Sequence, residues 1–460
     1  MNADKGGFGL ARVGARLTEG NVWGTILRFS LPFLLANLLQ ALYGASDLFM
    51  VGRFADSAGV SAVSTGGQVM QTITGLSVGL TAGGTVLIGQ YYGARRGRDM
   101  ADAVKTCLLL FGLLSAAMAA AALWFLDPIC ALMQVPAEAL PLTREYLRIC
   151  ACGIPFIVGY NAVSSILRGL GDSRTPLLFI TIACVINVST DLLFVGVLRW
   201  GAPGAAVSTV IAQIASLALA GCCLLARGHL AKYRRSRPRF RAVAARGMLS
   251  AGLPIALQEG LVNASFLVIT AVINHMGLVA SASVGVVEKL IVFSMLPTTA
   301  FASAIAAVTA QHRGAGLMDR ARRCLRVGVL LSLLFGIACF LAAQLAAPGL
   351  VGLFTRDPAM VEAGGWYLRS YSLDCVVVCF VFCMNAYFSG GGHPVFPLVH
   401  SLVSTCLVRI PLSWYLSHTP RAGLFHIGFA APCASLLSLA LCCAYLRGPG
   451  GKKRPAEPLP

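Results

Sequence analysis

Twelve segments of the chain are almost wholly apolar over 18 or more residues. They lie near 29–51, 58–88, 104–126, 146–167, 176–198, 204–226, 250–274, 279–310, 325–346, 367–388, 396–416 and 425–446. A helix of about 20 apolar residues crosses the hydrocarbon core of a bilayer. The segments lack the alternation of apolar and polar residues that membrane strands show. Since a spanning backbone must satisfy its own hydrogen bonds, we expect an all-α polytopic membrane protein with twelve transmembrane helices.

The basic residues are distributed unevenly between the loops. Only 12% of the chain is charged, against about 25% in a soluble domain. If successive loops alternate across the membrane, 27 of the 36 Lys and Arg fall on one side and 7 on the other, with Lys289 and Arg409 inside spans. Cytoplasmic loops are enriched in Lys and Arg, so both termini are expected in the cytoplasm. The stretch 227–246 has eight basic residues and no acidic one, which predicts contact with anionic lipid and no nucleic-acid role.

The second half of the chain repeats the first at an offset of about 221 residues. The repeated residues are Tyr146-Leu147-Arg148 and Tyr367-Leu368-Arg369, Gln90 and Gln311, Gly93 and Gly314, Gly169 and Gly390, Gly171 and Gly392, and Pro176 and Pro397. Each half has six spans, an even number, so both copies enter the membrane from the same side. We expect two homologous six-helix lobes related by an axis along the membrane normal, with a V-shaped central cleft, a common build of secondary transporters.

The spans and the repeat divide the chain into five regions. We predict a cytoplasmic N-terminus (1–28), an N-lobe (29–226), a basic cytoplasmic linker (227–249), a C-lobe (250–446) and a cytoplasmic tail (447–460). The first span is expected to act as its own targeting signal, because the preceding residues are polar and basic. A chain with both lobes holds a complete transport pathway, which predicts that it functions as a monomer.

Prolines and glycines inside the spans bear on helix shape and packing. Pro32, early in the first span, corresponds to Pro254, early in the seventh. A proline inside a helix removes a backbone hydrogen bond and kinks the helix, so Pro32 is a candidate hinge. Prolines are also common in membrane helices without such a role. Gly75, Gly79 and Gly83 recur at every fourth residue, a spacing that predicts close helix packing.

Polar side chains gather in the spans of the first half. A charged side chain near the bilayer centre costs at least about 2.5 kcal/mol, so each acid there needs an explanation. The set comprises residues of spans 1, 4, 5 and 6: Tyr43, Asp47, Asn161, Asn187, Asp191 and Thr209. The spacing of four residues between the Asn and the Asp of span 5 places both on one helix face.

The repeat serves as an internal control for this set. At an offset of 221 the counterparts of Asp47, Asn161, Asn187, Asp191 and Thr209 are, in that order, Val268, Phe382, Val408, Leu412 and Ala430. A shift of one or two residues restores no acid or amide, so the fold does not require these groups. A carboxylate in a medium of low dielectric takes up a proton readily, and Na⁺ prefers oxygen ligands. We predict a site that couples to H⁺ or Na⁺; the alternative is a purely structural set of hydrogen bonds.

The second half has ionisable residues of its own inside the spans. Glu259 and Asp374 are candidates to face the central cleft and attract a cationic substrate. Alternatively, one of them neutralises Arg409, which also lies inside a span. His275 and His312 lie near span ends and are expected to be solvated.

Several motifs of the chain resemble those of the multidrug and toxic compound extrusion (MATE) family. They are Leu-Thr-Glu-Gly at 17–20, the Leu-Pro start of spans 1 and 7, Gly-Gln-Tyr-Tyr-Gly-Ala at 89–94, Arg-Gly-Leu-Gly-Asp-Ser-Arg-Thr-Pro at 168–176 and Arg-Ile-Pro-Leu at 409–412. The resemblance runs from about residue 17 to 447. It implies a secondary antiporter of the bacterial cytoplasmic membrane, not an enzyme and without a cofactor. Such a protein exports cationic or amphipathic compounds in exchange for H⁺ or Na⁺ by alternating access.

The resemblance is strongest to the DinF-like branch of that family. This branch has a coupling-ion site made of an Asp on helix 1, an Asn on helix 4, Asn-x3-Asp on helix 5 and a Thr on helix 6. The match implies this role for Asp47, Asn161, Asn187, Asp191 and Thr209. Another branch uses acids in helices 7 and 10, where Glu259 and Asp374 lie. Because Glu259 comes earlier in helix 7 than in that branch, we expect coupling in the N-lobe.

Other functions have less support in the sequence. A lipid-linked sugar flippase of the same wider superfamily is the alternative. It often has fourteen spans and a cationic central cavity, whereas only Arg409 and Lys289 are basic deep inside spans here. A membrane-embedded enzyme or an ATP-driven pump is disfavoured, since the sequence has neither an HExxH motif nor a GxxxxGK[ST] loop. The sixteen cysteines include no CxxC pair, and we expect them to pack as small apolar residues.

Overall fold

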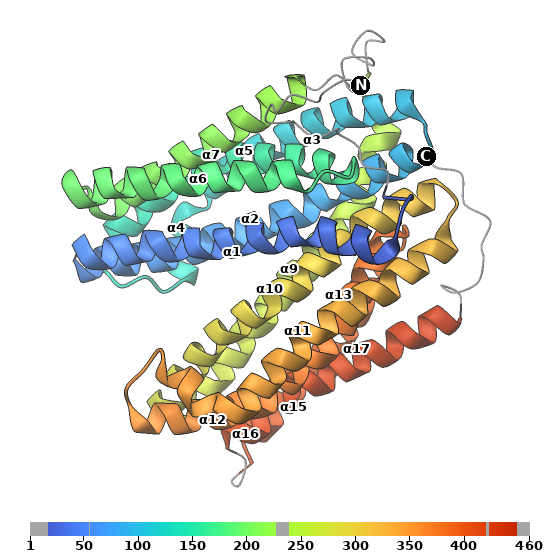
Figure 1. Ribbon diagram of the computed structural model, residues 1–460. Coiled ribbons are helices and arrows are strands. Elements are labelled where there is room, and N and C mark those ends of the chain that lie inside the picture. The colour runs from blue at the N-terminus through green and yellow to red at the C-terminus, as the bar shows by residue number, and fades with distance from the viewer. Residues whose placement is uncertain (1–16, 55, 227–238, 420–422, 449–460) are drawn as a thin grey trace, which may run out of the picture.

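The computed structural model of the chain (Figure 1) describes residues 17–54, 56–226, 239–419 and 423–448. Within these ranges every regular element is a helix. Twelve helical segments are long and apolar enough to cross a membrane, which confirms the predicted number. Many large side chains on their outer faces are exposed, among them Leu113 (73%) and Trp124 (83%). Such faces suit contact with lipid tails, because every backbone polar group of a helix is bonded internally.

The N-lobe holds the first six spans. Its elements are α1 (Val22–Phe54), α2 (Ser57–Gly93), α3 (Gly97–Trp124), the short α4 (Leu126–Leu132), α5 (Leu140–Gly169), α6 (Arg174–Asp191), the π-helix η1 (Leu192–Val197) and α7 (Gly201–Ala226). The π-helix continues α6, so the two together form the fifth span. Residues 1–16 of the predicted N-terminal region lie outside the described ranges.

The C-lobe repeats this order with two interruptions. Its elements are α9 (Ala242–Asn274), α10 (Leu278–Gly314), α11 (Met318–Gly352), α12 (Pro358–Tyr371), α13 (Leu373–Gly390), α14 (Val395–Ser404), the π-helix η2 (Thr405–Arg409), α15 (Ile410–Ser417), α16 (Leu424–Ile427) and α17 (Ala430–Arg447). The tenth predicted span is broken at Ser372, and the eleventh contains η2. Of the predicted linker 227–249, residues 227–238 lie outside the described ranges and 242–249 belong to α9; of the tail, 449–460 also lie outside.

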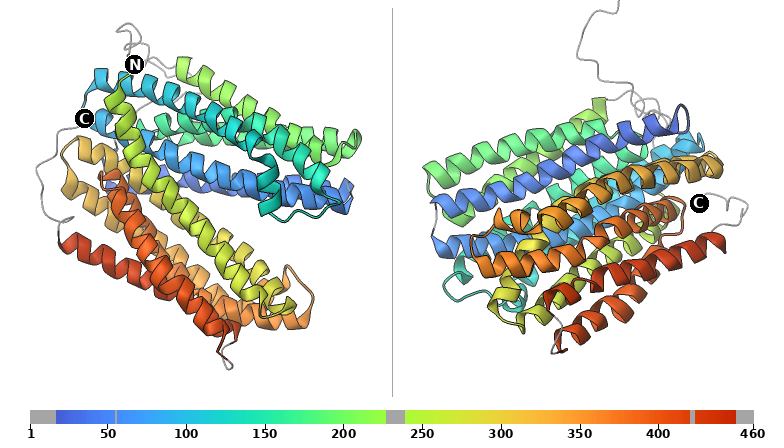
Figure 2. Two further views of the ribbon diagram at one scale, coloured as in Figure 1. Left: turned by 180° about the vertical axis from the view of Figure 1, so that it is seen from behind. Right: turned by 60° about the horizontal axis from the view of Figure 1, so that its bottom comes forward.

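The two lobes form a V. Figures 1 and 2 show that they meet at the end that holds the α2–α3 and α10–α11 turns and diverge toward the other end. This confirms the expected two-lobe arrangement. The end at which the lobes meet, called the closed end below, is the one where residues 93–97 and 314–318 connect their helices.

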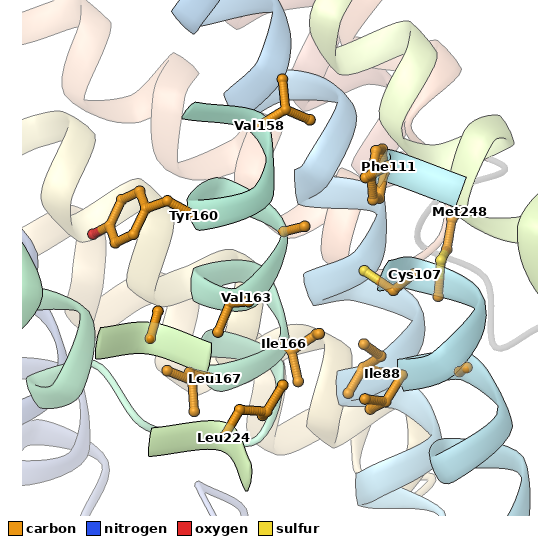
Figure 3. Packing of buried hydrophobic residues seen from close by; sticks show 14 of the residues in the cluster. Ile88, Cys107, Phe111, Val158, Tyr160, Val163, Ile166, Leu167, Leu224 and Met248 are labelled. Atoms are coloured by element: carbon orange, nitrogen blue, oxygen red, sulfur yellow. The ribbon is translucent and has the colours of Figure 1, made fainter. Parts of the chain in front are cut away.

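The first helix of each lobe begins inside the core of the other lobe. Ile26 and Phe33 of α1 are buried in one cluster with Phe301 of α10, although α1 belongs to the N-lobe. Met248 of α9 is buried in the N-lobe core, in the cluster that also holds Cys107 and Phe111 of α3 (Figure 3). Further along, α1 packs in the N-lobe core and α9 in the C-lobe core. Any movement of one lobe relative to the other must therefore act on α1 and α9.

Small residues allow α2 and α9 to approach closely at the closed end. A Cβ atom on Gly79 would lie 2.6 Å from Cα of Ala256, and one on Gly83 would overlap the carbonyl group of Met248. Neither Gly79 nor Gly83 has room for a side chain, as expected of glycines at a close helix contact. A Cβ on Gly75 would meet nothing within 4 Å, so that member of the predicted stripe makes no close contact.

Candidate cation-coupling site

The acidic and amide side chains predicted for the N-lobe site lie in the interior of that lobe. Asp47 on α1 is 6% exposed, and Asn187 and Asp191 on α6 are both fully buried. The spacing of four residues places the two α6 side chains on the same face, toward the lobe. The other face of α6 points outward, as Val185 shows with 63% exposure.

Asp47 is held against α7 by a short chain of hydrogen bonds. Thr209 Oγ1 donates to Asp47 Oδ2 at 3.0 Å. The hydroxyl of Tyr43, one helical turn before Asp47, donates to the backbone oxygen of Thr209 at 3.4 Å. The carboxyl groups of Asp47 and Asp191 are close enough to interact electrostatically, and Asn187 lies beside them. The structure thus brings together five of the six predicted residues.

Several oxygen atoms of this cluster have no hydrogen-bond partner among the described residues. They belong to two carboxyl groups, one amide and one hydroxyl: Asp47 Oδ1, Asn187 Oδ1, Asp191 Oδ1 and Oδ2, and Ser208 Oγ. Buried polar atoms are nearly always paired, so this concentration of unpaired oxygens needs an explanation. Oxygen donors of these kinds suit a hard cation, and two neighbouring carboxyl groups readily hold a proton between them.

Two residues differ from the expectation drawn from the sequence. Asn161 is buried on α5 with 7% exposure, but it forms no hydrogen bond with the other predicted residues in the described part of the chain. Ser208, which was not predicted from the sequence, is fully buried and lies beside Asp191. In the sequence, only its position directly before Thr209 could have pointed to the site. A serine inside a membrane span is too common to predict a site residue.

A π-helix begins directly after Asp191. In η1 the hydrogen bonds run from residue i to i+5, so each turn holds one residue more than an α-helix. Single π-turns occur frequently at functional sites. Here the change of pitch lies at the end of the helix that supplies Asn187 and Asp191.

Among the ionisable residues of the C-lobe, Asp374 and Arg409 lie near each other, whereas Glu259 does not share their surroundings. Glu259 is exposed on α9 and forms no hydrogen bond or ion pair with any described residue. Asp374, in the first turn of α13, is 4% exposed. Arg409 lies at the end of η2, where its Nη1 donates to Ser265 Oγ at 3.0 Å. The guanidinium interacts electrostatically with Asp374; of the two acids considered in the sequence, only Asp374 lies near it.

Two glutamines that the repeat singled out join the lobes at the closed end. Gln90 Nε2 donates to the carbonyl oxygen of Gly390 at 3.3 Å, and Gln311 Nε2 donates to that of Gly169 at 2.9 Å. The two bonds are copies of each other at the 221-residue offset. Gln311 Oε1 also accepts a hydrogen bond from the backbone N–H of Leu17 at 3.1 Å. We call this set of bonds the glutamine clasp.

The expectation for one of the histidines was wrong. His275 is exposed as expected, but His312 is fully buried in α10. Its Nδ1 lies 2.7 Å from the carbonyl oxygen of Val308, one turn earlier. Because α10 continues to Gly314 and packs against the other lobe, its last turn is not open to solvent.

Comparison with known proteins follows the same division into lobes. The MatE family model matches the chain twice, over residues 32–193 and 254–415. The probable multidrug resistance protein YoeA of Bacillus subtilis is 26% identical over 444 residues, which are 95% of this chain and 96% of that protein. A FAD transporter of Shewanella oneidensis is 26% identical over 439 residues, 94% of this chain and 95% of that one.

The fold also matches solved structures. One is a multidrug resistance MATE family transporter of the MOP superfamily in an outward-facing conformation. It covers 94% of this chain and 97% of its own with a TM-score of 0.86 at 22% sequence identity. At that identity the likeness establishes the arrangement of the helices and no more.

Proposed function

The chain belongs to the MATE family of transporters, and from that premise we propose that it is a secondary antiporter that exports cationic or amphipathic small molecules in exchange for H⁺ or Na⁺. The observation that carries the coupling is the buried pair Asp47 and Asp191, with its unpaired oxygens. A lobe that only needed packing would have no use for them, since the C-lobe has apolar residues at the positions of both acids.

The closed end of the V supports an orientation in the membrane. Its turns carry Arg95, Arg96 and Arg98 after α2 and Arg313 and Arg320 around the α10–α11 turn. Basic loops mark the cytoplasmic side. We therefore place the closed end and both termini in the cytoplasm of a bacterial cell, and the open side of the V faces outward. The glutamine clasp then closes the cytoplasmic side in this state.

Helix α1 is suited to link the cation site to the movement of the lobes. Its start is buried in the C-lobe core, and Asn37 Nδ2 donates to Thr299 Oγ1 of α10 at 3.1 Å. Its second half carries Asp47 in the N-lobe. Pro32 lies within the part of α1 that packs on the C-lobe, and we propose that it supplies the hinge for the rest of the helix. Cation binding at Asp47 and Asp191 changes the charge on one side of this hinge, and the helix transmits the change to the other lobe.

Coupling further requires that cation and substrate favour different states of the transporter. A ligand with equal affinity for both states shifts no equilibrium, however tightly it binds. We propose that the cation site and the substrate path between the lobes are loaded alternately, so that cation entry drives substrate release outside. The chain contains both lobes and so works as a monomer.

A dye-efflux assay tests this function in cells. The chain is expressed in a strain that lacks its own drug transporters, and the cells are loaded with a cationic dye. Efflux is compared under an imposed Na⁺ gradient, an imposed proton gradient and neither. We expect efflux to depend on one of the two gradients and to fall to the background of empty cells in Asp47→Asn. Efflux that is independent of both gradients contradicts the proposal.

A further inference from the structure

The polar residues of the N-lobe site have no acid or amide at the matching places in the C-lobe, but one matching place holds a base. The motifs before Asn187, such as Gly169 and Pro176, repeat at an offset of 221, which gives Val408. The two family matches begin at 32 and 254 and end at 193 and 415, an offset of 222 at both ends, which gives Arg409. The π-helix η2 covers 405–409 and holds one residue more than an α-helical turn. Arg409 is the last residue of this π-helix, and the offset of 222 pairs it with Asn187.

The contacts of Arg409 support this correspondence. Its Nη1 bonds to Ser265 Oγ, and its Cζ lies 4.3 Å from the ring centroid of Phe266. At the offset of 222, Ser265 corresponds to Tyr43, which belongs to the N-lobe site. The guanidinium therefore lies against the part of α9 that mirrors the site-forming part of α1. A cation over an aromatic face is also stabilised by the ring.

Two buried or half-buried acids lie near enough to this guanidinium for their charges to interact, although no ion pair within 4.0 Å joins them to it among the described residues. They are Glu288 on α10 and Asp374 on α13. Glu288 Oε1 accepts a hydrogen bond from Thr270 at 3.3 Å, and Asp374 Oδ1 has no hydrogen-bond partner among the described residues. At the offset of 221 both acids correspond to glycines of the N-lobe. The other titratable or charged groups near this place are Tyr367, Tyr371 and Lys289.

The two lobes thus hold comparable charge sets with one difference. The N-lobe site has Asp47 and Asp191 and no basic residue. In the C-lobe, Asp374 and Glu288 lie near Arg409, which occupies the place that corresponds to Asn187. An arginine side chain stays protonated in proteins, so its charge does not exchange with solvent. A fixed cation offsets the charge of nearby acids without binding an ion from either side of the membrane.

We propose that Arg409 is the resident cation of the C-lobe: it takes the place that the exchangeable coupling cation takes in the N-lobe, so that only the N-lobe responds to the ion gradient. This inference rests on the cation coupling proposed above. Removing the charge of Arg409 should turn the C-lobe interior into a second cation site, formed by Asp374 and Glu288.

The test measures cation binding through the melting temperature of the purified full-length chain. Na⁺ replaces choline at constant ionic strength, and in a second series the sample is acidified. The starting variant, called the parent, is Asp47→Asn/Asp191→Asn. Its N-lobe site has no carboxylate and should bind no cation. We expect this parent to show no cation-dependent shift, and Arg409→Met in the same parent to gain a rise on the order of several degrees in one of the two series. Arg409→Lys keeps a positive charge and should gain nothing.

A further variant tests whether the gained cation site contains Asp374, by removing this acid together with Arg409. Arg409→Met/Asp374→Asn should lose most of the gain. Where Arg409→Met does not fold, Arg409→Gln carries the same expectation, because it keeps a polar group near Ser265. A shift already present in the parent, or none in either Arg409 variant, overturns the inference. A wild-type protein without any cation-dependent shift instead contradicts the proposed function, so the two failures are distinguishable.

Discussion

Gln90 of the N-lobe donates a hydrogen bond to the carbonyl oxygen of Gly390 in the C-lobe, 300 residues later in the chain. Gln311 repeats the bond in the opposite direction, to Gly169. These residues stand out in the sequence only because they occur twice. In the structure they join the two copies where the lobes meet. The duplication therefore conserves a contact between the lobes as well as the lobes themselves.

Breaking the clasp should loosen the closed end. In Gln90→Ala/Gln311→Ala both cross-lobe bonds are lost, each worth about 1 kcal/mol. We expect faster hydrogen–deuterium exchange in segments 88–96 and 311–318, measured by mass spectrometry, with exchange elsewhere unchanged. Gln344→Ala is the matched control, since Gln344 bonds to Arg369 and Ser372 within one lobe. Equal exchange at the closed end in the double variant and the control would show that the clasp does not hold the lobes together.

Substituting the glycines of α2 with alanine tests how closely α2 and α9 pack. Gly83→Ala places a Cβ atom against the backbone of Met248 and should destabilise the contact by about 1–3 kcal/mol. Gly75→Ala meets nothing within 4 Å and should be neutral or slightly stabilising, since Ala favours a helix over Gly by about 1 kcal/mol. Thermal unfolding in detergent compares the two. If Gly83→Ala melts at the same temperature as Gly75→Ala, the close approach of α2 and α9 is not important for stability.

Pro32 should matter for turnover more than for stability. Pro32→Ala restores a backbone hydrogen bond in α1 and stiffens the helix at the proposed hinge, within the part that packs on the C-lobe. We expect the rate of gradient-driven dye efflux to fall several-fold while dye binding to the purified protein stays within about twofold of wild type. Pro155→Ala is the control, because Pro155 is also inside a helix but α5 does not cross between the lobes. Full efflux activity in Pro32→Ala would remove the hinge from the mechanism.

The bond from Thr209 to Asp47 should tune cation affinity. Thr209→Val keeps the shape of the side chain and removes the donor to Asp47 Oδ2. A hydrogen bond to a charged group contributes about 1.5–3 kcal/mol, so the cation concentration for half-maximal efflux should change by about tenfold or more. Thr181→Val removes an equivalent hydroxyl on the exposed face of α6, where it bonds only to Leu177, and should leave that concentration unchanged. Identical cation dependence in both variants would contradict a direct role of Thr209.

The sequence predicts those features of the fold that depend on local periodicity. Apolar length gives the twelve spans, and a spacing of four residues puts Asn187 and Asp191 on one face. The exchange of helix starts between lobes was not predictable, because Ile26 and Met248 are apolar residues like any other until their partners are known. The clasp was equally hidden, since its bonds join residues 142 and 300 apart.

Most of the other features that the sequence did not predict involve departures from regular α-helix. The π-helices η1 and η2 have no signature in the composition of their residues. The offset of 221 paired Asn187 with Val408, whereas the offset of 222 between the two family matches pairs it with Arg409. Asn161 shows the opposite case: its position in the sequence pattern predicted a site residue, but the structure shows no hydrogen bond to the cluster.

Transport in proteoliposomes tests the central claim most directly. The purified chain is reconstituted, a cationic substrate is supplied, and uptake is measured while an inward or outward H⁺ or Na⁺ gradient is imposed. Asp47→Asn is compared with wild type and with Asp127→Asn, whose side chain is 68% exposed. We predict gradient-driven exchange in wild type and in Asp127→Asn, and at least a tenfold loss in Asp47→Asn with substrate binding retained. Undiminished gradient-driven exchange in Asp47→Asn would contradict the account.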